Sequence, residues 1–585
     1  MVEAKCIHID SQKAANPDEP LGDPQWQALI ALHRTLLYEY HDFLMATQHP
    51  SANRALRGLA MKYHVPARMW KHGIHAFLEI LRHRRPDSQE YMLAFIIVAY
   101  QMMLLLSETV PLFTDTWIEC LGDLARYRMA IEKDKEAHAT WGSVAARWYT
   151  MASDKHPQVG RLYHHLGILE RPSLRKFYFY ARSLTSTDAF LNAKESLATL
   201  CSPILNDCQA LENGTHSVEA MLICFHAGVF STQPAKLFEG DGKKALNLLV
   251  KQPDSKIGVY GTSLAVTNVA AVLGFGAPDN TYRQAYNQAL RFDENISTCE
   301  VDMLGSAKSV RSLRTPPDFV LSFTFQAFNT IIIRQPTKEG IIDLLPYTHV
   351  SLIFLTSLQH IRAYLDKSDP LLSLLDNLGI DWGTLARFLN RLASFFPITS
   401  RIEMLARSST FPKGGKPLQE DYLIRGLVWC QWYFSAEWFQ GTEDDDGSRA
   451  LADADRQQRR AERVLYLGLT LAFRSKFLCY DDTRRVFSAA PDQLVSQAPG
   501  PASPKSPSAS SSLSGNFVLV SPVQTPLPPS EHACAASKTI ASIMDAVADH
   551  SAVAKREAKQ LADKPPKTCG LRDGGEFKIM NGGQW

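Results

Sequence analysis

Basic residues gather in a few short stretches of the sequence, and these stretches are the first candidates for binding chemistry. They are centred on Arg84 and Arg85, on Arg171, Arg175 and Lys176, and on residues 456–463. Proteins hold single-stranded nucleic acid with cations that contact phosphates and with aromatic rings on which bases stack, and aromatic residues follow Lys176 directly. The helical period places several of these rings inside a helix pair, however. A solvated basic helix face is therefore the alternative for each stretch.

Motifs of the common catalytic classes are missing from the sequence. We find no Gly-rich phosphate loop with a lysine, no nucleophile elbow and no His-Glu-x-x-His pair. The 10 cysteines include no Cys-x-x-Cys pair, and no histidines stand at zinc-finger spacing from them. We therefore expect reduced thiols in a cytosolic or nuclear protein, and we predict no enzyme, no metal, no cofactor and no small-molecule substrate.

The charge balance limits how an anionic partner could be bound. The 585 residues carry 62 Lys and Arg against 60 Asp and Glu, which gives a formal net charge of +2. A chain with this balance and 45% hydrophobic residues is neither disordered throughout nor a basic chromatin protein. Any anion-binding surface must therefore be local.

The dominant apolar period is helical, and no stretch shows the alternation and turns of strands. Residues 91–107 and 319–333 form uncharged apolar runs, and the first is close to the length of about 18 that marks a transmembrane candidate. Acidic residues flank the first run, and short helices that are apolar all round are typical of the centre of a helical bundle. We predict a soluble all-α protein with no membrane partner.

The two ends of the chain differ from the rest in composition. Residues 1–22 show no apolar run after the first basic residue, so we expect a flexible N-terminus without a secretory signal. Ser, Pro, Ala and Gly dominate much of the other end, so residues 486–585 are predicted to form a disordered tail. Ser-Pro and Thr-Pro pairs in this tail suit proline-directed kinases, and an unmodified linker is the alternative.

Residues 138–185 have the pattern of stacked helical hairpins. Helices are expected at 138–153, 159–170 and 173–184. Small residues such as Gly167 stand where helices would cross, and aromatic residues such as Tyr149 stand where they would fill the space opposite. A tetratricopeptide hairpin requires this arrangement, although solenoid packing alone explains it without any function.

A specific resemblance follows from residues 121–128, Leu-Gly-Asp-Leu-Ala-Arg-Tyr-Arg, together with the hairpin and residues 178–197. These elements resemble the ever-shorter-telomeres (Est) and SMG nonsense-mediated-decay adaptor family. Further stretches resemble the second region of that family, namely residues 376–390, 421–439 and 463–468. The likeness covers about residues 25–485 and is most similar to the fungal branch.

The resemblance implies a domain organisation. A 14-3-3-like tetratricopeptide domain is expected at 23–210, and long helical hairpins of the Est-type DNA/RNA-binding domain are expected at 211–485. Some family members end in a PIN nuclease domain, which needs a set of acids at strand ends. The Ser/Pro-rich sequence after residue 485 lacks such a set, so we expect no nuclease.

The resemblance also implies a phosphate-binding residue. An arginine of the 121–128 element binds phosphoserine on the 14-3-3-like face of relatives, and Arg126 matches it. On a helix Asp123 lies one turn before Arg126 and could hold its guanidinium until a phosphate arrives. The alternative is that the two residues only brace two helices. The complete predicted phosphopeptide site consists of Arg126, His75, Lys71, Arg128 and His164.

Two positions depart from the family pattern. His75 stands where relatives that bind phosphopeptides carry lysine, and His164-His165 stands where they carry Asn-Gln. A histidine carries charge only when protonated, so these changes weaken the predicted site or make it pH-sensitive. Ordinary packing histidines, rather than a metal pair, are expected at 164 and 165.

The function implied by the resemblance is that of a non-catalytic adaptor. It would bind a phosphoprotein or acidic peptide in telomere maintenance or nonsense-mediated mRNA decay, in the nucleus, the cytoplasm or both. The first alternative is direct binding of single-stranded telomeric DNA or RNA within a ribonucleoprotein, through the basic stretches at 84–85 and 171–176. The second alternative is a helical scaffold without phosphate recognition.

Overall fold

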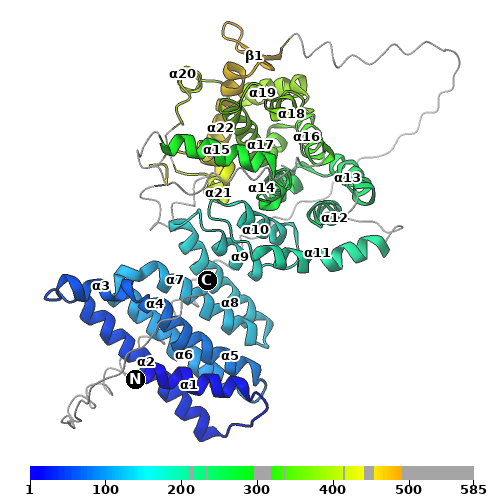
Figure 1. The fold of residues 1–585 in the computed structure, drawn as a ribbon. Coiled ribbons are helices and arrows are strands. Elements are labelled where there is room, and N and C mark those ends of the chain that lie inside the picture. Colours follow the sequence, from blue (N-terminus) through cyan, green and yellow to red (C-terminus); the bar gives the residue numbers. More distant parts are fainter. Residues whose placement is uncertain are drawn as a thin grey trace. The chain divides into compact units, whose positions relative to one another are not determined.

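Helices form nearly all of the described chain, so the all-α prediction is confirmed (Figure 1). The computed structural model describes residues 1–210, 217–231, 235–295, 318–334, 336–412, 416–435, 437–439 and 453–490. These residues belong to one compact unit, Met1–Leu513, and a second unit, Ser514–Trp585, lies outside the described residues. The predicted disordered tail also lies outside them from residue 491 onward.

The first part of the chain is a succession of packed helices. The elements are α1 (Val2–Ala15), α2 (Asp23–Gln48), α3 (Arg54–Lys62), α4 (Val65–Arg68), the π-helix η1 (Met69–His75), α5 (Ala76–His83), α6 (Gln89–Thr109), the 3₁₀ turn η2 (Pro111–Phe113), α7 (Thr114–Ile131), α8 (Lys135–Lys155), α9 (Gly160–Leu169), α10 (Leu174–Thr185) and α11 (Ala193–Ala210). Helix α7 packs against α6 and α8, and α8, α9, α10 and α11 each pack against the next. The expected helical array is therefore present.

The second part continues with longer helix pairs. The elements are α12 (Val218–Phe230), α13 (Ala235–Val250), α14 (Asp254–Val272), the 3₁₀ turn η3 (Gly274–Gly276), α15 (Thr281–Asn295), α16 (Asp318–Ile332), α17 (Lys338–Arg362), α18 (Pro370–Asp376), α19 (Trp382–Phe395), α20 (Ser400–Ser408), α21 (Gln419–Ile424), the 3₁₀ turn η4 (Val428–Cys430), α22 (Asp453–Arg474), β1 (Leu478–Asp481) and β2 (Val486–Ala489). Helix α12 packs against α13, and α17 packs against α14 and α22.

The hairpins at α8, α9 and α10 form as the sequence predicts. Helix α8 begins after Asp134, whose carboxylate accepts a hydrogen bond from Ala137 N at 2.7 Å. Helices α9 and α10 cross at Gly167, where an added Cβ would lie 2.7 Å from Cε1 of Tyr180. A small residue thus faces an aromatic ring at this crossing, which confirms the packing predicted for the hairpin.

Residues 2–15 form α1, so the prediction of a flexible N-terminus is wrong for them. The helix buries Cys6 and Asp10, which are 0% and 6% exposed. Asp10 Oδ1 lies 3.2 Å from Nε2 of His33 on α2, and His33 Nδ1 donates to Gly73 O on η1 at 3.0 Å. The sequence conceals this docking because its anchor is a polar pair rather than an apolar stripe.

Two short strands are a second difference from the predicted pattern. Strands β1 and β2 pair antiparallel, and β2 lies at the start of the predicted tail. The side-chain amide of Asn390 on α19 pairs with Phe487 in both directions, since its Nδ2 donates to Phe487 O and its Oδ1 accepts from Phe487 N. This anchoring through a single side chain explains why a few ordered residues extend past 485.

Among the described residues, two helices are long and apolar enough to cross a membrane, judged by length and composition alone. They are α6 and α17, and 39% and 72% of their most apolar windows are buried within the structure. Helix α17 packs against α14 and α22, and α6 packs against α2, α5 and α7. Packing between helices accounts for most of the apolar composition of α17 and for a smaller share of that of α6.

The cysteines differ in one respect from the expected set of reduced thiols. Cys6, Cys120, Cys201, Cys430 and Cys479 are free. Cys224 on α12 is disulfide-bonded, so the expectation of reduced thiols is wrong for this residue.

Helix α12 also buries a histidine among aromatic rings. His226 is 0% exposed and lies 5.9 Å, between ring centroids, from both Phe177 and Phe323. Burial lowers the pKa of His226 to about 3, against a smaller opposing effect of Asn268. The folded chain therefore keeps this ring neutral where the unfolded chain, with the ordinary value of 6.5, binds a proton.

His226→Leu is expected to reduce the loss of stability in mild acid. Because the folded pKa is depressed, the stability that neutral His226 preserves is complete above 6.5 and falls as the pH drops towards 3. The loss amounts to about 1.4 kcal/mol per pH unit for one such group. Urea unfolding at about pH 7 and about pH 5.5 measures it. The exposed His138→Leu is the control, and an unchanged pH dependence in His226→Leu would contradict the assignment.

Candidate functional site

Arg126 is held on the surface of α7 by residues of α7 and α8. Its Nη2 donates to Asp123 Oδ1 at 2.9 Å, and its Nε donates to Tyr149 Oη at 3.2 Å. Tyr149 Oη in turn donates to Asp123 Oδ1 at 2.6 Å. The close approach of α8 depends on Gly122, where an added Cβ would lie 2.7 Å from the Tyr149 ring. The sequence therefore builds a closed triangle of Arg126, Asp123 and Tyr149.

The charges in this triangle stabilise each other. Burial raises the pKa of Asp123, but His165, Arg126 and Tyr149 outweigh it, and the net pKa is well below the usual range. Burial lowers the pKa of Arg126, but Tyr149 and Asp123 outweigh it and raise the net value. Both groups are therefore ionised at neutral pH. The Arg126 side chain remains 28% exposed, and its Nη1 has no hydrogen-bond partner among the described residues.

The two histidines of α9 lie beside this triangle and differ in role. His165 Nδ1 is 3.4 Å from Asp123 Oδ1, and its ring meets the Tyr149 ring edge-on at 4.9 Å. His164 Nε2 is 2.8 Å from Ser196 Oγ, and its ring lies 5.1 Å from Phe190. Burial, with smaller effects of nearby cations that include Arg126, lowers the pKa of His164 to about 4. His164 therefore contributes no charge at neutral pH.

Helix η1 brings the other predicted residues towards the same face. His75 and Lys71 are both exposed there, four residues apart. The ring of Tyr127 lies between His75 and Arg126, at 6.4 Å from the His75 ring and 5.5 Å from Arg126 Cζ. A π-helix is rare and is often found at functional positions. The structure thus places His75 and His164 near Arg126, and Lys71 is exposed on η1 four residues before His75.

Arg128 does not belong to this face. Side chains of residues two apart on a helix point in different directions. Arg128 pairs with Glu132, and its Cζ lies 5.6 Å from the centre of the Trp141 ring. It shares no hydrogen-bond partner with Arg126. Its predicted place in the phosphopeptide site is therefore not supported by geometry, and it becomes a useful control position.

The basic stretches of the sequence are spread over separate parts of the fold. Arg84 donates to the carbonyls of Lys13 and Asn16 and so anchors the end of α1, while Arg85 is exposed. Arg171 is exposed between α9 and α10. Its two neighbours are engaged, since Arg175 pairs with Glu170 at 2.7 Å and Lys176 Nζ donates to Glu170 O at 2.8 Å.

The third stretch, in α22, is mostly structural. Arg460 is buried and forms a two-pronged pair with Glu420. Arg463 is 4% exposed and lies 3.9 Å above the Phe411 ring. These arginines are consequently unavailable to nucleic acid. The expectation of a solvated basic face is wrong for them as well, because apolar and acidic partners from distant segments cover them.

Sequence reasoning found the Asp123 contact but missed Tyr149 and His165 as parts of the same network. Their roles depend on the crossing of α7, α8 and α9, which spacing along one helix does not reveal. The Gly122–Tyr149 combination was the available signal, since a glycine facing an aromatic ring marks a close crossing.

Comparison with known proteins identifies the family. The Est1 DNA/RNA binding domain model matches residues 145–431. The chain is an Est/SMG family member. EST/SMG-like protein 2 of Saccharomyces cerevisiae is 24% identical over 249 residues, which are 38% of this chain and 20% of that protein. Telomerase-binding protein EST1A of Danio rerio is 42% identical over 84 residues, which are 14% of this chain and 5% of that protein.

A solved structure described as Est1 and Cdc13 aligns with 83% of this Est/SMG chain and 98% of its own, at 11% identity and a TM-score of 0.49. The alignments with the two curated relatives span a fifth of their length or less. The Est1 domain of this family member begins within α8 and ends just after η4. Arg126 precedes it, so the domain match leaves the predicted phosphate site untested.

Proposed function

We propose that this Est/SMG family member is a non-catalytic adaptor that binds a phosphorylated or acidic peptide at the Arg126 face. The observation that carries the proposal is the exposed guanidinium of Arg126, held by Asp123 and Tyr149 with Nη1 directed to no described residue. A guanidinium whose direction is already set loses little side-chain entropy when an anion binds.

The geometry favours a doubly charged anion over a carboxylate. Asp123 already neutralises much of the charge of Arg126, so an incoming anion must compete with it. A phosphoserine carries about −1.5 to −2 charges at neutral pH, and its oxygens can reach more than one donor. His75 on η1 and Arg126 both contact the Tyr127 ring, so His75 can add a contact to the same anion, and a protonated His75 would add charge.

Single-stranded nucleic acid is a second candidate ligand. The matched domain is described as DNA/RNA binding, and one relative is named a telomerase-binding protein. Telomere maintenance and nonsense-mediated decay are the pathways we propose, with action in the nucleus, the cytoplasm or both. The exposed Arg85 and Arg171 remain the basic residues best placed for phosphate contacts in the predicted stretches.

Arg126→Glu is expected to weaken binding of a phosphoserine peptide by at least about tenfold, which corresponds to about 1.4 kcal/mol. The substitution replaces the arginine that would contact the phosphate with a glutamate, whose negative charge repels the phosphate. Titration of the full chain with a phosphoserine peptide, its unphosphorylated twin and a telomeric single strand measures the effect. Arg128→Glu is the matched control, because it makes the same charge change on the same helix but on another face.

The three ligands separate the candidate functions. Preference for the phosphorylated peptide, lost in Arg126→Glu and kept in Arg128→Glu, supports the peptide adaptor. Preference for the single strand that both variants retain supports the nucleic-acid candidate. Equal and negligible binding of all three ligands would contradict the phosphate site and would support the helical scaffold without phosphate recognition.

A further inference from the structure

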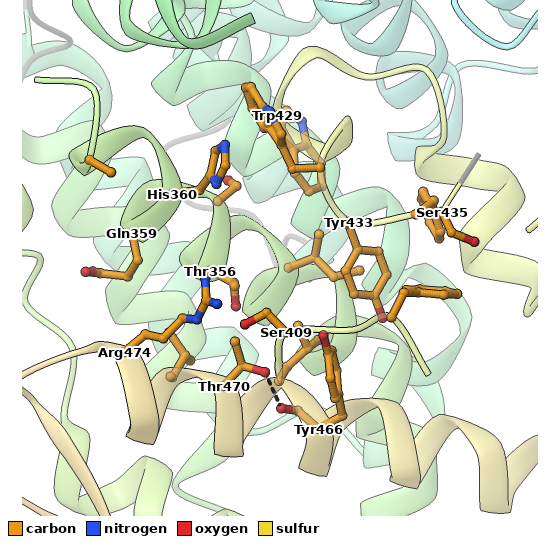
Figure 2. Close-up of a pocket in the computed structure, with 18 of the residues that line it drawn as sticks. Thr356, Gln359, His360, Ser409, Trp429, Tyr433, Ser435, Tyr466, Thr470 and Arg474 are labelled. Carbon is orange, nitrogen blue, oxygen red and sulfur yellow. Dashed lines mark hydrogen bonds between the residues drawn. The ribbon is translucent and has the colours of Figure 1, made fainter. Parts of the chain in front are cut away.

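A cavity of about 450 Å³ lies between α17, α22 and the segment from Trp429 to Ser435 (Figure 2). Its lining also includes Ser409 and Phe411, which follow α20. The volume lies in the range of about 300–1,000 Å³ found for small-molecule sites. None of the lining residues belongs to α7, α8 or α9, so this cavity is separate from the Arg126 face.

Aromatic rings form the walls of the cavity. The Trp432 ring stacks on Tyr286 at 6.0 Å and lies 4.5 Å from the His360 ring. Tyr433, Phe434 and Tyr466 also line the space, and Figure 2 shows Tyr433 opposite the α22 residues. Rings that are already held in place by other rings make a rigid platform for a flat ligand.

Several polar atoms in the lining lack partners. Trp429 Nε1, Gln359 Nε2, Ser409 Oγ and Ser435 Oγ are buried, and each has no hydrogen-bond partner among the described residues. Trp429 is 0% exposed, so its indole N–H is far from bulk water. Buried polar groups of this kind cost free energy unless a ligand or water satisfies them. A ligand with both donors and acceptors around a flat ring would do so.

The charge of the cavity favours an anion. Among the described residues no aspartate or glutamate lines it, whereas the cationic Arg474 does. Arg474 is exposed at the end of α22, and Figure 2 shows it beside Thr356. An exposed arginine at the rim of an aromatic cavity can contact a phosphate while the ligand's ring lies inside.

We propose that this cavity binds a nucleotide unit, meaning a nucleobase that carries a phosphate. The base packs against Trp432 and Tyr433, its edge meets the unpartnered polar atoms that lie nearest to these rings, and the phosphate contacts Arg474. Base–aromatic stacking combined with a basic contact is how proteins hold single unpaired nucleotides. An aromatic peptide side chain would fill the rings but leave most of the buried polar atoms unpaired. The proposal goes beyond the peptide adaptor function and does not rest on it.

The test is a titration of the full chain with AMP, GMP, CMP and UMP, read by tryptophan fluorescence. Trp429 and Trp432 lie in the cavity wall, so an occupied cavity should change their emission. We expect saturable binding of at least one mononucleotide and none of ribose 5-phosphate, which lacks the base. Arg474→Glu is expected to weaken binding at least about tenfold, and Trp432→Leu by about tenfold through loss of stacking.

Matched controls keep a folding defect apart from loss of the site. Arg54→Glu makes the same charge change at an exposed position of α3 and is expected to bind nucleotide as the wild type does. Urea unfolding of each variant shows whether it is folded. If Trp432→Leu does not fold, the affinity of Arg474→Glu alone tests the proposal. Equal binding of ribose 5-phosphate and nucleotides, or unchanged affinity in Arg474→Glu, would overturn the proposal.

Two further ligands distinguish the source of the nucleotide. A single-stranded oligonucleotide that binds more tightly than every mononucleotide, and that Arg474→Glu also weakens, assigns the cavity to a strand. Mononucleotide binding without oligonucleotide binding assigns it to a free nucleotide. A phosphotyrosine peptide that binds where no nucleotide does would overturn the proposal in favour of a peptide.

Discussion

Replacing Arg182 with leucine is expected to lower the free energy of unfolding by about 3 kcal/mol, because it leaves buried carbonyl groups without a donor. Arg182 on α10 is 1% exposed. Its Nη2 donates to Arg425 O at 2.8 Å, and its Nη1 donates to Tyr422 O at 3.2 Å and also to Leu423 O. The guanidinium lies 3.7 Å above the Tyr163 ring. One side chain therefore joins α9 and α10 to the C-terminal end of α21.

The size of this effect follows from what remains after the substitution. Tyr178 Oη still donates to Leu423 O at 2.7 Å, so that carbonyl keeps a partner. The carbonyls of Tyr422 and Arg425 lose the hydrogen bonds that Arg182 donates, and each such buried group costs about 1–3 kcal/mol. Removal of a buried cation offsets part of this cost. Leucine preserves the apolar stem but has no donor.

Urea unfolding of the full chain at neutral pH measures the change. Arg175→Leu is the matched control on the same helix, since Arg175 pairs with Glu170 at a largely exposed position. Such surface pairs contribute about 0–1 kcal/mol. A variant Arg182→Leu as stable as Arg175→Leu would show that the contacts between α10 and residues 422–425 do not stabilise the fold.

Local features of the fold could be predicted where the deciding contacts lie close in sequence. The hairpins at α8, α9 and α10 are visible from a helical apolar period, and the Asp123–Arg126 pair follows from spacing on a single helix. Arg182 belongs to the same predicted hairpin, yet the carbonyl groups that accept its hydrogen bonds lie 240 to 243 residues later in the sequence. No period or composition records a partner at that distance.

The same limit applies at glycines and at polar anchors. Helix α14 contains Gly258 and Gly261, and these two glycines let α17 approach closely. Helix α1 docks through Asp10 and His33 rather than through an apolar stripe. In both places the residue type suggests a loop or surface, whereas the tertiary contact determines the structure. The nucleotide cavity likewise combines segments from 353 to 474 and has no sequence motif.

Breaking the buried pair between Glu420 and Arg460 is expected to cost about 3–5 kcal/mol. Glu420 is 2% exposed, and Arg460 donates from Nε to Oε1 at 2.6 Å and from Nη2 to Oε2 at 2.7 Å. His349 Nδ1 lies 3.2 Å from the same carboxylate and connects it to α17. Arg460→Leu would leave the buried carboxylate with His349 but without its arginine, and Glu420→Leu would leave the guanidinium of Arg460 without its carboxylate.

A double-mutant cycle tests whether the cost comes from the unpaired charge. The variant with both leucines removes both charges and is expected to be more stable than the sum of the single effects implies. Arg459→Leu is the control next in sequence on α22, since Arg459 pairs with the more exposed Asp455 at 2.7 Å. Additive single effects, measured by urea unfolding, would show that the two side chains act independently.

The pH dependence of the same pair gives an independent check. Burial raises the pKa of Glu420, but Arg460 and His349 outweigh it, so the net pKa lies well below the ordinary value of 4.5. A depressed carboxylate pKa contributes stability that is complete above 4.5 and is lost as the pH falls through the folded value. The stability difference between the wild type and Glu420→Gln should therefore shrink below about pH 4.5. A difference that stays constant from neutral pH to about pH 3 would mean that folding does not lower the pKa of Glu420, and the attraction to Arg460 could not then be what holds α21 to α22.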